Sequence, residues 1–582
     1  MITMPTRIHK AWEIIFILVA SAAALLTPRC YSQTEAQTAA SAAIVTLRAD
    51  PQPAAADASA GNLSVTQGEP APRSNTVLDP TVPAAVLKEL EVMKARIEQL
   101  EALLRERAVP QSSSPASVAA TGKAAQTVLA TTAVEPGMLQ SESTSLPSPA
   151  PPEKKSKAEP FAFADWTWLN GNPRNKDVAF DTKFFTPEIR TDINYVYDFN
   201  HPKDDSIGGS SELFRSNEIQ ITQLGVGGDF HWENVRARLM TQFGMYSQTT
   251  PRNDASPARG QWNLDNAYRY LSEAYGGYHI DALHGINLDA GIFVSYIGLA
   301  SYYNFDNWMY QPSYVSSNTP WFFNGLRVQI FPTEKLKIEP WFINGWQSYG
   351  RFNGRSGVGG QIRWAPAPWI NFIFNNYGVG ADALNIPHRT RLHTDDSVEI
   401  KYYDKPEKFL DKMAFTFTGD LGCETGGGVN CTTNRKNSAG QIVDFKQSFL
   451  GFMVYNRFWF KNDLYALTLG GGKINNPGRY LVLLPPINGA TAASGTPYFT
   501  ENPGDPFKAW DTTLTFDYMP RQYITFRWEY GHRHTNVPYF SGPGGTTPAA
   551  GNTGTPAIPV PGFSPDLRLT EDKVVFAIMT KF

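Results

Sequence analysis

Cysteine and a surplus of charge of one sign are both lacking in this chain. The 582 residues include only 3 cysteines, and 51 basic against 54 acidic residues give a net charge of −3. A nucleic-acid-binding protein normally carries a basic surplus, so we expect no nucleic-acid partner. A mean hydropathy of −0.31 argues against a bundle of apolar transmembrane helices. Phosphate-binding glycine loops with their lysine and paired Cys-x-x-Cys motifs are also missing, so we predict no cofactor and no catalytic site.

Aromatic residues are almost missing from the first 160 positions. The chain contains 35 Phe, 14 Trp and 25 Tyr, but only Trp12, Phe16 and Tyr31 precede residue 161. Residues 33–84 and 109–160 are instead rich in Ala, Pro, Ser and Thr, which offer little apolar surface to bury. We predict that both stretches are disordered linkers. The chain is therefore expected to consist of two unlike parts.

The first 32 residues have the pattern of an export signal. Arg7 and Lys10 form a positive region, and residues 14–26 form an apolar stretch too short to cross a bilayer as a helix. We predict cleavage after Ser32; the alternative is a membrane anchor that is not cleaved. Either interpretation places the rest of the protein outside the cytoplasm.

After cleavage, the remaining cysteines are Cys423 and Cys431. They flank a glycine-rich segment and are eight positions apart, which predicts a local disulfide in an oxidising compartment. A metal site would require further Cys or His ligands nearby, and none follows. His532 and His534 are two positions apart without a third ligand, so we interpret them as loop-surface residues and predict no metal site.

Residues 85–108, between the two linkers, carry a heptad pattern. The apolar positions alternate steps of four and three, as in a coiled-coil core: Val86, Leu90, Met93, Ile97, Leu100 and Leu104. The alternative is an amphipathic helix packed on its own chain. A helix isolated between disordered linkers has little of its own chain to pack on, so we favour a periplasmic coiled coil that joins several copies. The core residues leave dimer and trimer open.

From residue 161 to residue 582 the hydrophobic pattern has a period of two, which is typical of β-strands. In residues 188–199, apolar and aromatic side chains alternate with Glu, Arg, Asp and Asn, and segments near residues 224–243 and 514–530 repeat the pattern. Short turns such as Glu233–Asn234 alternate with long loops such as 248–260. This asymmetry is typical of an antiparallel transmembrane β-barrel. The length suits about 16–18 strands, enough to leave a water-filled interior.

The final strand provides a second signal. In residues 573–582, Val574, Phe576, Ile578 and the terminal Phe582 share one face. A terminal phenylalanine in register with such a strand resembles the signal that the outer-membrane barrel assembly machinery recognises. We therefore predict that Phe582 is an assembly signal and that the outward faces contact outer-membrane lipids.

Three motifs carry a resemblance to a known family. They are an Asn-Trp loop at Asn304–Trp308, a glycine-containing strand and turn at Gly325–Leu336, and Asn344-Gly345-Trp346. With the segment around residues 229–244, they resemble the outer-membrane β-barrel porin-2, or OmpL-like, family. The resemblance implies a pore but transfers no individual functional residue. The coiled coil is similar to that of several trimeric porins, which favours a homotrimer by analogy.

The predicted function is therefore passive diffusion of small hydrophilic solutes through a porin in the bacterial outer membrane, with an N-terminal periplasmic segment. The alternative is a structural or adhesive barrel that links the membrane to the periplasm or cell wall. Six charged residues on polar strand faces are candidates for the channel interior: Arg190, Asp192, Arg236, Arg238, Arg527 and Glu529. Their mixed signs predict weak ion selectivity, and the pair Arg236 and Arg238 could favour anions. These charges could equally serve only to solvate the wall.

Overall fold

The computed structural model describes Lys94 and residues 159–203, 205–252, 254, 261–317, 319–351, 355–380, 388–477, 507–546 and 564–582. The predicted signal peptide, the first linker, residues 109–158 of the second linker and the six coiled-coil core positions lie outside these residues. The chain divides into two units, 1–143 and 144–582. The strands, helices and contacts described below belong to the second unit.

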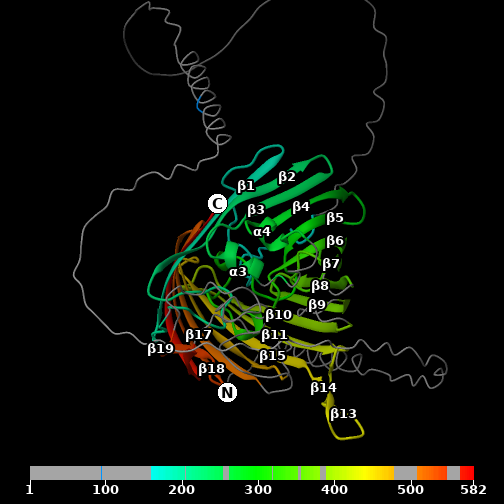
Figure 1. Cartoon of the computed structure of the whole chain (residues 1–582). Helices are drawn as coiled ribbons and strands as arrows, with labels where there is room; N and C mark the ends of the chain where they lie inside the picture. Colours follow the sequence, from blue (N-terminus) through cyan, green and yellow to red (C-terminus); the bar gives the residue numbers. More distant parts are fainter. Residues whose placement is uncertain are drawn as a thin grey trace, which may run out of the picture. The chain divides into compact units, whose positions relative to one another are not determined.

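Sixteen of the described strands form one closed antiparallel barrel (Figure 1). Each pairs with its neighbour along the chain, and the last pairs with the first, which is the up-and-down order expected of a membrane barrel. The barrel strands are β1 (Phe185–Asp198), β2 (Ile219–Trp232), β3 (Val235–Thr241), β4 (Leu271–Ile280), β5 (Ile286–Val294), β6 (Phe322–Thr333), β7 (Leu336–Ile343), β8 (Gly357–Ala367), β9 (Ile370–Gly380), β10 (Thr390–Asp404), β11 (Leu410–Thr425), β15 (Ser448–Phe460), β16 (Tyr465–Asn475), β17 (Lys508–Arg521), β18 (Ile524–Thr535) and β21 (Thr570–Lys581).

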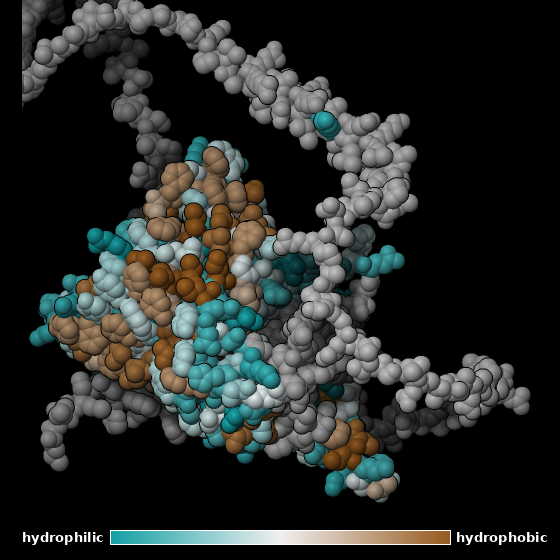
Figure 2. Space-filling model, turned by 60° about the vertical axis from the view of Figure 1, so that its left-hand side comes forward, coloured by the Kyte–Doolittle hydropathy of each residue, from teal (hydrophilic) through white to brown (hydrophobic). Residues whose placement is uncertain are grey.

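The period-two pattern gives each strand an apolar outer face and a polar inner face. Along β17, Leu514 and Phe516 are 43% and 40% exposed, whereas Thr515 and Asp517, which alternate with them, are fully buried. In a membrane barrel, large apolar residues with this exposure face lipid. Figure 2 shows such residues gathered in brown over much of the visible outer surface.

The connections between strands alternate in length. The β2–β3 and β6–β7 turns are two residues long, at 233–234 and 334–335, whereas residues 295–321 connect β5 to β6. Short turns mark the periplasmic end and long loops the outer end of such a barrel. No helix in the described part of the chain is long and apolar enough to cross a membrane.

The long loops contain the smaller elements. They hold the helices α3 (Tyr246–Arg252), α4 (Leu264–Tyr268), η1 (Asn304–Asp306) and α5 (Tyr314–Ser317), and the strands β12 (Val429–Asn430), β13 (Arg435–Lys436), β14 (Ile442–Lys446), β19 (Phe540–Thr546) and β20 (Ser564–Arg568). Strands β12, β14 and β13 form a three-stranded sheet that projects from the outer end of the barrel (Figure 1).

Strand β21 closes the barrel against β1. Beyond their ladder, Phe582 and Ile189 exchange two backbone hydrogen bonds of 2.9 and 3.2 Å. The ring of Phe582 is 52% exposed and stacks on that of Tyr523. Its role as an assembly signal stays a prediction.

The interior of the barrel contains a buried aromatic cluster. Trp168, Trp308 and Tyr314 belong to it, and none is more than 3% exposed. The aromatic residues from position 161 onward are therefore not confined to the lipid-facing surface. Many of them fill the barrel from within, on loops and on the segment that precedes β1.

Candidate channel interior

Loop 3, defined as residues 295–321, lies inside the barrel. Its residues Asn304, Asp306, Tyr310 and Ser313 are each 6% exposed or less. A Cβ at Gly472 of β16 would lie 2.3 Å from Oγ of Ser313, so a glycine at this wall position lets the loop approach. Loop 3 thus narrows the space that sixteen strands enclose.

Two candidate residues of β1 bind loop 3. Nη1 of Arg190 donates to Oδ2 of Asp306 at 3.0 Å, and its guanidinium lies 4.0 Å from the ring centre of Tyr303. The carboxylate of Asp192 accepts hydrogen bonds from Tyr310 and Asn304, both at 2.8 Å. Both β1 side chains are therefore anchors for the loop.

Two further candidate arginines, on β3, form ion pairs with the wall. Arg238 contacts Glu188 at 3.1 Å, Asp229 at 2.8 Å and Glu273 at 3.0 Å. Arg236 has one longer contact, 3.3 Å to Asp289, and its side chain remains 31% exposed. Only Arg236 of this pair retains substantial contact with solvent.

Arg527 and Glu529 on β18 bind the loop 3 backbone. Arg527 pairs with Asp517 at 2.7 Å and donates to three carbonyl oxygens of loop 3, those of Asn304, Asn307 and Met309, at 3.2, 2.6 and 2.8 Å. The carboxylate of Glu529 accepts the backbone N–H groups of Tyr310 and Gln311 at 2.6 and 2.8 Å. The guanidinium of Arg527 holds its donors in a planar fork, which lets it bind several carbonyl oxygens at once.

Further anchors were not among the sequence candidates. Arg457 on β15 donates to the carbonyl of Trp308 at 2.9 Å, and Arg533 on β18 donates to that of Pro312 at 2.9 Å. Asp511 on β17 accepts from Ser313 and Tyr314 at 2.8 and 3.0 Å. All three lie on polar strand faces, so the alternation of polar and apolar residues places their side chains inside the barrel. No signal in the sequence shows that they bind loop 3.

Residues 159–177, which we call the strap, cross the end of the barrel that carries the short turns. The backbone N–H of Asn170 donates to Glu399 of β10 at 2.8 Å, and its side-chain oxygen accepts the N–H of Trp308 at 2.8 Å. The N–H of Gly171 donates to the carbonyl of Asp306 at 3.1 Å. A Cβ at Gly171 would lie 2.4 Å from a carbonyl oxygen of loop 3, so glycine permits this contact. The strap and loop 3 therefore meet inside the barrel.

The two ends of the strap are held at the rim. The N–H of Phe161 donates to the carbonyl of Glu334 in the β6–β7 turn at 2.7 Å. Arg174 donates to the carbonyl of Arg521 at 2.9 Å and to Oγ1 of Thr525 at 3.0 Å, beside the β17–β18 turn. Burial lowers the pKa of Arg174 to about 10, so it remains a cation at neutral pH.

An open cavity of about 310 Å³ lies beside the β2–β3 turn. Its lining includes Arg236, Tyr275, His231 and His279, together with Asp229. The half-buried candidate Arg236 therefore lines a water-accessible part of the barrel rim.

At the outer end, a carboxyl is buried under the loops. Glu212, in the β1–β2 loop, is 8% exposed and accepts a hydrogen bond from the backbone N–H of Ser211 at 3.3 Å. Burial raises the pKa of Glu212 to about 7. This loop therefore contains a group that titrates near neutral pH.

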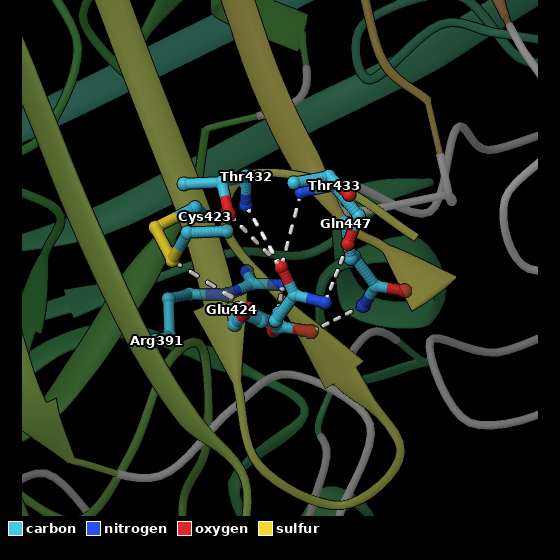
Figure 3. The surroundings of a disulfide bond; sticks show 8 residues. Arg391, Cys423, Glu424, Thr432, Thr433 and Gln447 are labelled. Carbon is cyan, nitrogen blue, oxygen red and sulfur yellow. Dashed lines mark hydrogen bonds and ion pairs between the residues drawn. A yellow bond between two sulfur atoms is a disulfide. The ribbon is translucent and has the colours of Figure 1, made fainter. Parts of the chain in front are cut away.

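Cys423 and Cys431 form a disulfide at the base of the projecting sheet (Figure 3). Beside it, the carboxylate of Glu424 accepts a hydrogen bond from Arg391 of β10 at 2.7 Å. The disulfide therefore lies next to a buried ion pair of the barrel wall. No cluster of three or more His, Cys, Asp or Glu suited to a metal occurs among the described residues. His532 instead contacts Asp572 at 2.8 Å.

The family model for putative beta-barrel porin-2, OmpL-like, matches residues 191–558. No curated protein is significantly similar to the chain.

Three solved structures to which the chain is similar are outer-membrane proteins of bacteria. An anion-selective porin from Comamonas acidovorans is 9% identical, with a TM-score of 0.39, covering 68% of this chain and 99% of that one. The outer membrane channel DcaP of Acinetobacter baumannii is 13% identical, with a TM-score of 0.37, covering 70% and 100%. OprB of Pseudomonas putida is 10% identical, with a TM-score of 0.39, covering 68% and 94%.

Proposed function

The chain belongs to the putative β-barrel porin-2, OmpL-like family, and on that premise we propose that this outer-membrane channel conducts small hydrophilic solutes by passive diffusion. The observation that carries the proposal is the closed barrel of sixteen strands with charged and polar side chains on its inner face. Barrels of this size enclose water unless other parts of the chain fill them.

Loop 3 and the strap determine what can pass. Both lie within the barrel, so the passage is narrower than the wall alone would enclose. The cavity of about 310 Å³ near Arg236 marks the accessible part of the turn-bearing rim. We therefore favour solutes that are small and polar.

The assembly and location of the chain complete the proposal. The heptad positions from Val86 to Leu104 support a periplasmic coiled coil that joins copies of the chain, with a trimer favoured. The apolar outer faces suit contact with outer-membrane lipids. The terminal Phe582 suits recognition by the barrel assembly machinery.

Single-channel recording of the purified protein in a planar lipid bilayer tests the proposal. We expect stepwise conductance, and vesicles that contain the protein should swell in small sugars but not in large ones. Heat-modifiable migration on gels confirms that each sample is a folded barrel. A folded barrel that never conducts would overturn the proposal and favour the structural or adhesive alternative.

A further inference from the structure

The strap crosses the full width of the barrel. It touches the β6–β7 turn through Phe161 and the start of β18 through Arg174. In the closed order of strands, β7 is the seventh and β18 the fifteenth of sixteen. The two contacts therefore lie on opposite sides of the rim, and the residues between them span the opening.

The middle of the strap fills the space below loop 3. Trp166, Trp168 and Leu169 are 8%, 1% and 3% exposed, and they belong to the same buried cluster as Trp308 of loop 3. Nε1 of Trp308 donates to the carbonyl of Trp168 at 3.2 Å. Strap and loop 3 thus form two successive obstructions along one passage.

The two obstructions are attached differently. Loop 3 has its backbone bound by the buried arginines Arg457, Arg527 and Arg533. The strap contains no described strand, so its removal breaks no β-ladder. The strap is held by hydrogen bonds from both of its ends and its middle to the wall, the turns and loop 3, and two of its aromatic rings lie on the cations Lys335 and Arg363.

The wall beneath the strap is polar. The guanidinium of Arg363 lies 4.5 Å from the ring centre of Phe161, and the ammonium groups of Lys335 and Lys401 lie 5.0 and 5.7 Å from the rings of Phe163 and Trp168. Charged groups such as these are well solvated by water when a ring leaves. Withdrawal of the strap therefore leaves these cations hydrated, and the apolar surface that it exposes belongs to the cluster shared with Trp308.

We propose that the strap is a displaceable plug that closes the turn-bearing half of the channel, and that its withdrawal opens the passage beside loop 3. The proposal rests on the proposed diffusion function. The channel should have a small conductance while the strap is in place and a larger conductance after the strap is withdrawn.

The test uses a strap-release variant of the full chain that carries Trp166→Ala, Trp168→Ala and Asn170→Ala. The matched control carries Val178→Ala and Phe180→Ala, which alter side chains that are 63% and 61% exposed just beyond the strap. Trp168→Ala alone serves as a milder variant if the triple variant does not assemble.

A second readout does not depend on conduction. Asn371 of β9 is fully buried and donates to Glu399, the strap's partner on β10. Asn371→Cys is introduced into each background, and its reaction with a small water-soluble thiol reagent is timed.

We expect a several-fold larger conductance and several-fold faster labelling in the strap-release variant, with the control unchanged from the unmodified protein. If the unmodified protein conducts but release changes neither quantity, the plug is refuted and the diffusion function stands. If no variant conducts but release accelerates labelling, the diffusion function is refuted while the strap still covers the wall.

Discussion

Replacing Arg527 should free loop 3 from the barrel wall. Arg527→Met keeps a side chain of comparable length but removes the donors that bind the carbonyls of Asn304, Asn307 and Met309. Asp517 does not become unpaired, because Arg457 still contacts it at 2.7 Å. The main loss is therefore the docking of loop 3.

The magnitude follows from the burial of the site. Arg527 is 1% exposed, and a hydrogen bond made by a charged group contributes about 1.5–3 kcal/mol, so losing the bonds to three loop 3 carbonyls should cost at least about 3 kcal/mol. Because Arg457 still pairs with Asp517, this loss adds no unpaired buried carboxylate. Since about 1.4 kcal/mol is a tenfold change in an equilibrium, undocked loop 3 should become at least about a hundredfold more populated.

Two measurements follow the loop in the Arg527→Met protein. Single-channel traces should show larger and noisier openings, and chymotrypsin should cut within loop 3, which contains five tyrosines. Arg527→Lys separates docking from charge, because lysine keeps the charge but lacks the planar fork. We expect Arg527→Lys to resemble Arg527→Met.

The reasoning fails if Arg527→Met leaves both the current noise and the cleavage of loop 3 unchanged. It fails equally if Arg527→Lys matches the unmodified protein while Arg527→Met changes only the ratio of anion to cation permeability. That pattern would make Arg527 a selectivity charge instead of a loop anchor.

Three further predictions concern other parts of the chain. The pKa of Glu212 is raised from 4.5 to about 7, so the neutral carboxyl stabilises the β1–β2 loop fully below pH 4.5, and about 3 kcal/mol of this stabilisation is lost as the pH rises through 7. Proteolysis of the loop should therefore increase as the pH rises from 4.5 through 7. The variant Glu212→Gln should abolish this increase. Replacing Cys423 and Cys431 by serine should destabilise the projecting sheet by about 2–3 kcal/mol, measured as faster cleavage of residues 426–447, whereas altered conductance would contradict a purely local staple. Deleting residues 86–104 should abolish chemical crosslinking between copies, and an unchanged oligomer would place the contacts on the barrel wall instead.

The barrel wall was predictable from the sequence because each strand carries its own signal. The alternation of Leu514, Phe516 and their polar neighbours specifies which face meets lipid, whatever the rest of the chain does. The observed sixteen strands lie within the predicted range of about 16–18 for the same reason. Only the closure of the barrel, in which β21 pairs with β1, depends on segments far apart in the sequence.

The filling of the barrel was not predictable in the same way. Asn170 and Trp308 are 138 positions apart, and nothing local to either residue shows that they meet. Aromatic residues return to the sequence at Phe161, and this change of composition predicts that the barrel itself begins there. The first strand begins at Phe185, so those aromatic residues belong to the contents of the barrel.

The near-neutral composition has a structural counterpart inside the barrel. Arg190 pairs with Glu188 and Asp306, and Arg238 lies among three carboxylates, so the proposed anion-favouring pair of Arg236 and Arg238 has little free charge. A cation whose donors are already bound to carboxylates attracts a passing anion weakly, because the field of each pair falls off steeply in water. Arg236, with its single 3.3 Å contact, is the exception in this group. Selection by size, through loop 3 and the strap, is therefore a stronger expectation than selection by charge.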